Sequence, residues 1–153
     1  MIPLDELIQL VNEANAQRWP TGHPSLYPAN AGRLEAQLEA EYQVSTRLAA
    51  YGTLAPGRSN HHVVAPLGGS WEGGVVEGDL HPVGWGATQG FPAFRPRPGG
   101  DVVPVQVLTS SALAGDWARL DQFEGKAYRR ILVPVFATGG RTVLTVANLY
   151  AAA

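Results

Sequence analysis

The chain has 153 residues, of which 45% are hydrophobic and 16% are charged, and its formal net charge is −2. This composition predicts one globular domain with a sizeable core and excludes a disordered chain. The absence of cysteine excludes disulfides, thiolate metal sites and a cysteine nucleophile. The negative charge argues against nucleic acid as a partner. No apolar run approaches the ~20 residues that span a bilayer, and the acidic start differs from a secretion signal, so a cytoplasmic protein without membrane contact is expected.

Residues 1–45 are predicted to form a helical N-terminal extension. Apolar residues recur at helical spacing from Leu4 to Val11, which predicts a helix over residues 3–18, and a second amphipathic helix is predicted over residues 32–42. Between them, residues 19–32 hold three prolines and two glycines and should form a linker or loop. We expect the acidic helices to pack on a sheet or to pair two copies into a homodimer. The sharper alternative is that the loop covers a pocket.

The second part of the chain, residues 46–153, has the pattern of a twisted or barrel-like sheet, because short apolar segments alternate with glycine and proline. The predicted strand over residues 71–81 contains several glycines, and the missing side chains should allow a sharp bend or the close approach of neighbouring backbone. A helix that Ser110 or Ser111 caps is expected over residues 110–123, and an irregular loop anchored by Trp85, Phe91 and Phe94 over residues 84–100. The predicted strands span residues 47–54, 71–81, 102–108, 128–137 and 141–150, the last two forming a hairpin across residues 138–140.

Several familiar signatures do not apply to this chain. The glycines at 84–90 have one residue too many for a dinucleotide fingerprint and do not open a helix, so no cofactor is expected there. His61 and His62 are adjacent, so in an extended segment they face opposite ways. Surface histidines are therefore favoured over a metal site, and no metal is predicted.

Residues 51–54 form the first candidate half of a site. A strand that ends in Tyr-Gly-Thr-Leu and enters a loop with proline and glycine exposes successive backbone N–H groups, which can form a nest that binds anions. The plain alternative is an ordinary turn from strand to loop.

Glu124 is the second candidate. An amphipathic run that includes Leu113, Trp117, Leu120 and Phe123 ends at this carboxylate, just before a glycine. A carboxylate near the negative end of a helix dipole and among aromatic groups should favour its neutral form, which suits proton transfer near neutral pH. The plain alternative is a solvated residue at the end of a helix.

Taken together, these two stretches resemble the γ-glutamylcyclotransferase-like superfamily, which includes the AIG2-like proteins. The resemblance covers residues 46–153. Its main carriers are the Y-G-T-L motif at 51–54 and the L-D-x-F-E-G-x-x-Y-x-R motif at 120–130, with Phe91-Pro92-Ala93 between them. The strand at residues 103–108 and His81 depart from the usual family pattern, which leaves pocket shape and substrate choice open.

The resemblance implies an α+β fold in which a small, strongly curved mixed sheet or barrel is flanked by helices. It implies an enzyme that converts a γ-glutamyl amine or small γ-glutamyl peptide into 5-oxoproline and a free amine, without a cofactor. Glu124 would be the general acid and base, and a non-catalytic binding or interaction module of the same fold is the alternative. The substrate would be held by Tyr51, Gly52, Thr53, Leu54 and Tyr128.

Overall fold

The structure is a computed structural model that describes residues 2–21, 27–29 and 32–153. The predicted pocket-covering loop at residues 20–32 falls largely outside the described residues. The α-helices are α1 (Leu4–Arg18), α2 (Arg33–Tyr42) and α3 (Trp117–Glu124), with short 3₁₀ helices at Val44–Thr46, His61–Val63, Ala65–Leu67, Gly86–Thr88 and Ser111–Gly115. The strands are β1 (Arg47–Ala50), β2 (Ser70–His81), β3 (Ala93–Pro96), β4 (Asp101–Thr109), β5 (Tyr128–Phe136) and β6 (Val143–Ala152).

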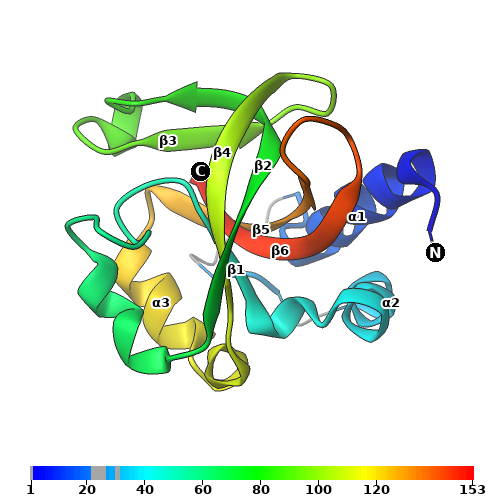
Figure 1. The fold of residues 1–153 in the computed structure, drawn as a ribbon, viewed down its shortest axis with the longest axis horizontal. Helices are drawn as coiled ribbons and strands as arrows, with labels where there is room; N and C mark the ends of the chain where they lie inside the picture. The colour runs from blue at the N-terminus through cyan, green and yellow to red at the C-terminus, as the bar shows by residue number, and fades with distance from the viewer. Residues whose placement is uncertain (1, 22–26, 30–31) are drawn as a thin grey trace.

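The described strands form a closed mixed barrel of five strands with one further strand on its edge (Figure 1). The sheet order is β3-β2-β4-β1-β6-β5, and a pairing between β2 and β5 closes the ring. The pair of β1 with β6 is parallel and the other pairs are antiparallel. This arrangement confirms the expected α+β class with a strongly curved sheet.

Alternating valines explain how the barrel fills its interior. In β4, Val103, Val105 and Val107 are buried while the residues between them are exposed, as expected for a strand with one face toward a core. β-branched side chains favour this pleated setting. Phe94 from β3 and Leu149 from β6 belong to the same core cluster.

Strand β2 contacts three other strands, and its glycines allow this. A Cβ on Gly78 would lie 2.2 Å from the carbonyl oxygen of Arg95, and one on Gly74 would lie 2.7 Å from a methyl group of Val135. The predicted close approach of neighbouring chain at the glycines of this strand is therefore confirmed.

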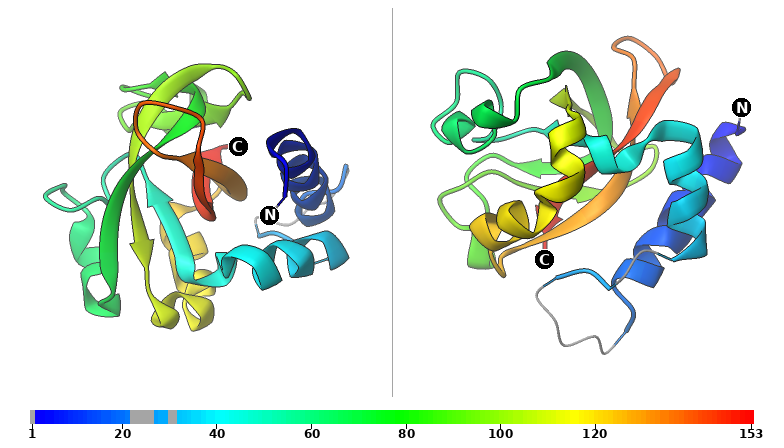
Figure 2. Two further views of the ribbon diagram at one scale, coloured as in Figure 1. Left: turned by 45° about the vertical axis from the view of Figure 1, so that its right-hand side comes forward. Right: turned by 90° about the horizontal axis from the view of Figure 1, so that it is seen from below.

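The N-terminal helices lie side by side on one flank of the barrel, against β5 and β6 (Figure 2). Leu7 and Leu38, one from each helix, form a core cluster with Leu132 and Val146 of the barrel, and all four are at most 1% exposed. The expected packing of these helices on the sheet is confirmed. None of the described helices is both long and apolar enough to cross a membrane.

Four local predictions differ from the structure. β1 ends at Ala50 and the chain then turns, so the predicted strand over 47–54 is too long. The loop predicted over 84–100 contains β3, and within it Phe91 is 56% exposed and is no anchor, whereas Phe94 is fully buried. The predicted helix over 110–123 is divided into a 3₁₀ turn and α3.

The fourth difference is the hairpin, whose connection is longer than predicted because β6 begins at Val143. Ser110 does cap the 3₁₀ turn, because its Oγ accepts a hydrogen bond from the backbone N–H of Ala112 at 3.2 Å.

Candidate active site

One cavity of about 210 Å³ brings the two predicted half-sites together. It opens where β1 ends and α3 ends, and its size suits a small ligand. Its described lining carries one carboxyl group, that of Glu124, and no basic side chain. The lining residues are Leu48, Ala49, Ala50, Tyr51, Gly52, Thr53, Leu54, Asn60, Phe91, Pro92, Phe123, Glu124, Tyr128 and Tyr150.

The chain places Glu124 at the cavity by ending α3 at that residue. Gly125 has a φ of 73°, a conformation that other residues rarely adopt, and its N–H closes the last turn on the carbonyl of Asp121 at 3.0 Å. The chain then turns directly into β5. Glu124 is half-buried and makes no ion pair among the described residues.

Burial raises the pKa of Glu124 to about 7, and the nearby negative charge of Asp121 adds to this change. Both effects disfavour the ionised form of the carboxyl group. Its two protonation states are therefore similarly populated near neutral pH. A carboxyl group in this range can both accept and return a proton.

Gly52, Thr53 and Leu54 of the loop after β1 line the same cavity. Among the described residues, the N–H groups of Gly52, Thr53 and Leu54 donate to no other protein group. Asn60 fixes the loop, because its N–H donates to Thr53 O at 2.9 Å and its side-chain amide donates to Thr53 Oγ1 at 3.0 Å. These N–H groups are available to hold an anion or a developing negative charge.

Two tyrosines of the cavity, Tyr51 and Tyr128, are held by hydrogen bonds to backbone carbonyls. The Tyr51 hydroxyl donates to Tyr150 O at 2.6 Å, and the Tyr128 hydroxyl donates to Pro92 O at 2.8 Å. Burial raises the pKa of both hydroxyls, and the Glu124 charge adds to the effect. Both tyrosines are therefore neutral donors at physiological pH, and their rings form rigid walls.

The cavity also contains residues that the sequence did not single out as site residues. Phe91 and Phe123 are 56% and 45% exposed, and both line the cavity. Pro92 and Tyr150 complete the wall. The Phe91-Pro92-Ala93 motif was a signal for two of these, whereas nothing local marks Tyr150 as a wall residue.

None of the described histidines lines the cavity. His61 lies 2.9 Å from the Leu54 carbonyl through its Nδ1, and its ring contacts that of Trp71. Within residues 2–21, 27–29 and 32–153, no group of three or more His, Asp or Glu side chains lies close enough to hold a metal ion.

Comparison with solved structures supports the fold. An AIG2-like protein from Mus musculus matches with a TM-score of 0.54 and 18% identity, covering 71% of this chain and 77% of that one. An uncharacterized protein from Pyrococcus horikoshii matches with a TM-score of 0.51 and 21% identity, covering 70% and 77%. A search of curated proteins gives no match.

The comparison with family models gives stronger evidence of relationship, because it compares the sequence rather than the fold. The model of the family described as gamma-glutamyl cyclotransferase, AIG2-like matches residues 48–153, which span the barrel, the 51–54 loop and α3. The chain therefore belongs to the gamma-glutamyl cyclotransferase, AIG2-like family.

Proposed function

We propose that the protein is a γ-glutamyl cyclotransferase that converts a γ-glutamyl amine or small γ-glutamyl peptide into 5-oxoproline and a free amine. The observation that carries this proposal is the shared cavity, which is lined both by Glu124 and by residues 52–54, whose backbone N–H groups have no acceptor among the described residues. Family membership supports the same class of reaction.

The lining of the cavity matches the charges of a γ-glutamyl group. An α-ammonium group would lie beside Glu124, which carries the only carboxylate in the described lining of the cavity. An α-carboxylate would be held by neutral donors such as the N–H groups of Gly52 and Thr53, because the described part of the lining has no basic side chain. Backbone donors of this kind are fixed before the ligand arrives, so they lose little on binding.

The reaction needs no protein nucleophile. Glu124 takes a proton from the substrate's α-ammonium, and the freed amine attacks the γ-carbonyl carbon to form a five-membered ring. The carbonyl oxygen carries the negative charge in the tetrahedral intermediate. As this intermediate collapses, the bond to the leaving nitrogen breaks, and Glu124 returns the proton to that nitrogen. The ring nitrogen gives up its second proton, and the released amine takes up one proton as it becomes an ammonium ion. Holding the amine near the carbonyl supplies part of the acceleration.

The alternative of a non-catalytic binding or interaction module is less favoured. Glu124 lines the cavity without an ion pair among the described residues. In a pocket that had lost its catalytic function, this carboxylate would be free to pair with a basic side chain. The large exposed hydrophobic residues of the described chain lie outside α1 and α2, so these helices offer no apolar stripe to a partner.

The direct test is to incubate the protein with a panel of γ-glutamyl amines and peptides and to measure 5-oxoproline and the released amine. We expect at least one substrate to give both products in equal amounts. Glu124→Gln should lower kcat by roughly 10³-fold or more while changing substrate affinity little. Turnover by Glu124→Gln at the wild-type rate would refute the assigned role, and release of amine with free glutamate would indicate hydrolysis instead.

A further inference from the structure

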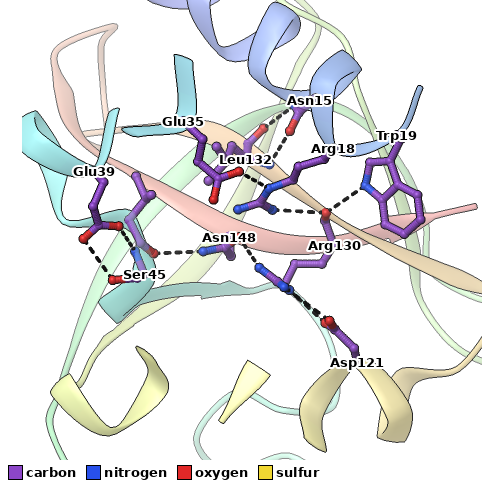
Figure 3. A network of polar contacts seen from close by, with 11 residues as sticks. Asn15, Arg18, Trp19, Glu35, Glu39, Ser45, Asp121, Arg130, Leu132 and Asn148 are labelled. Atoms are coloured by element: carbon purple, nitrogen blue, oxygen red, sulfur yellow. Dashed lines mark hydrogen bonds and ion pairs between the residues drawn. The ribbon is translucent and has the colours of Figure 1, made fainter. Parts of the chain in front are cut away.

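Figure 3 shows a network of polar contacts that includes Arg18, Asp121 and Arg130. Asp121 lies three residues before Glu124 in α3, and its carboxylate belongs to this network. It accepts hydrogen bonds from Arg130 Nε at 2.8 Å, from Arg130 Nη2 at 3.2 Å and from the Tyr150 hydroxyl at 2.7 Å. The side chains of Asp121 and Arg130 are only 8% and 11% exposed, so this ion pair is a fixed part of the interior.

The network touches the cavity at two points. Tyr150 is a wall residue, and its hydroxyl is held by Asp121 while its carbonyl accepts the bond from Tyr51. Residues three apart on a helix share a face, so Asp121 and Glu124 move together with α3. A displacement of Asp121 would therefore shift both the carboxyl group and one wall of the site.

The N-terminal helices hold Arg130 from the other side. At the end of α1, Arg18 Nη1 and Trp19 Nε1 both donate to the carbonyl oxygen of Arg130, at 3.2 and 3.1 Å. Arg18 is itself 3% exposed and paired with Glu35 of α2. Both helices thus contribute to the position of the Arg130 backbone.

The side chain of Arg130 is fixed as well. Its Nη1 donates to Asn148 Oδ1 at 3.1 Å, and the Asn148 amide donates to Val44 O at 2.8 Å, in the segment that joins α2 to β1. The guanidinium also stacks 4.6 Å from the centre of the Trp117 ring in α3. Asn148 is completely buried, so these bonds have no competition from water.

We propose that Asp121 and Arg130 are positioning residues for Glu124, and that the N-terminal helices serve this site by holding Arg130 in place. The helices precede the matched family segment of 48–153, so this assigns a role to a part of the chain that the family does not account for. The proposal deepens the proposed function and rests on it for its catalytic meaning.

A direct measurement of Glu124 ionisation tests the first part. The groups around Glu124 are Asp121 on its own helix, Tyr51 after β1, Tyr128 of β5 and Tyr150 of β6, with Arg130 behind Asp121 and the exposed Lys126 beyond. Asp121→Asn removes a negative charge but keeps an acceptor for the Tyr150 hydroxyl. The titration midpoint of Glu124, followed by carbon NMR of labelled glutamate, should move to a lower pH by roughly 0.5 to 1.

Asp116→Asn is the matched control, because Asp116 precedes the same helix and pairs with the half-exposed Arg119. It removes an equal charge and should leave the midpoint unchanged. An unchanged midpoint in Asp121→Asn, or an equal change in the control, would overturn the proposal. If the unpaired Arg130 prevents the Asp121→Asn protein from folding, the double variant Asp121→Asn/Arg130→Gln removes both charges. The midpoint of Glu124 should move in the same direction in that variant.

The second part is tested with Arg18→Met/Trp19→Phe, which removes both donors to the Arg130 carbonyl. We expect kcat to fall roughly fivefold or more with KM within about twofold, because the site is misplaced rather than emptied. Asn15→Ala is the control: Asn15 bonds the backbone of Leu132 twice, so it joins α1 to the same strand without touching Arg130. Equal loss of kcat in both variants would show general loosening and refute a specific role for Arg130.

These two measurements also separate this inference from the proposed function. If no γ-glutamyl amide were turned over, the proposed function would fail. The titration of Glu124 would still decide whether Asp121 sets its ionisation.

Discussion

At the scale of single residues, the role proposed for Glu124 in proton transfer comes with a cost to stability. Its carboxyl group lies in a cavity whose described lining includes three tyrosines and no basic side chain. The same burial that raises its pKa to about 7 also disfavours its charged form in the folded protein. Activity and stability should therefore respond to pH in opposite directions.

The activity prediction concerns the acid side of the pH profile. If Glu124 must be ionised to accept the substrate's proton, kcat/KM should fall tenfold for each decrease of one pH unit below about pH 7. The profile is measured with one γ-glutamyl substrate between pH 5 and 8. A limb with a midpoint near the ordinary glutamate value of 4.5 would contradict the assignment.

The stability prediction concerns Glu124→Gln. In the unfolded chain this carboxyl ionises near 4.5, but in the folded protein it ionises near 7, so wild-type stability is lost as the pH rises through this window. At pH 8 the loss amounts to roughly 3 kcal/mol, because a pKa that differs by one between the folded and unfolded states corresponds to about 1.4 kcal/mol. Neutral glutamine avoids this loss.

Glu124→Gln should therefore raise the free energy of unfolding at pH 8 and change it little at pH 4. Urea unfolding at the two pH values measures this difference. The exposed Glu6→Gln is the control and should have little effect at either pH. A destabilised Glu124→Gln at pH 8 would show that the carboxylate is better solvated than its surroundings indicate.

At the scale of elements, strand β2 shows how small side chains allow one strand to bond to β3, β4 and β5. A Cβ on Gly78 would clash with the backbone carbonyl of Arg95. A Cβ on Gly73 would meet only the flexible side-chain amide of Gln106, at 3.7 Å. The two glycines lie in the same strand but have different structural roles.

Gly78→Ala should destabilise the protein by roughly 1–3 kcal/mol, because the strands must separate to admit the methyl group. Gly73→Ala should be neutral or stabilise by a few tenths of a kcal/mol, since alanine restricts the unfolded chain. Urea unfolding of the two variants measures the contrast. Equal effects would mean that strand propensity, not the close approach, sets the need for glycine.

Local patterns predicted most elements and drew attention to both halves of the candidate site, because helical spacing, strand alternation and the glycines that end elements can be read from neighbouring residues. The same patterns missed β3, since the strand ends at a proline, Pro96, has Pro92 and Pro98 close on either side, and pairs on one side only. They also could not distinguish Phe91 from Phe94. The choice depends on which ring the barrel interior receives.

The network behind the site was beyond reach for a different reason. Arg18 and Arg130 are 112 residues apart, and their contact depends on how α1 crosses β5. Asp121 and Arg130 stand in the motif at 120–130, but nothing local in the sequence links them to Arg18 in the predicted N-terminal helix. Only the fold shows that Arg18, Asp121 and Arg130 are buried together.

At the scale of the whole molecule, the N-terminal helices and the barrel share a core. Leu38 of α2 is fully buried in a cluster that includes Leu132 and Val146 of the barrel. Asn15 adds two hydrogen bonds between α1 and the backbone of β5. Because these contacts cross from one part to the other, loss of packing in the helices should affect the barrel as well.

Leu38→Ala should therefore destabilise the entire chain by roughly 2–4 kcal/mol, as expected for a large-to-small change in a core. Unfolding followed by tryptophan fluorescence and by circular dichroism should give coincident single transitions. The exposed Gln37→Ala in the same helix is the control and should change stability little. Two separate transitions, with only the first shifted by Leu38→Ala, would show that the helices fold apart from the barrel. They would then also be poor candidates for holding Arg130 in place.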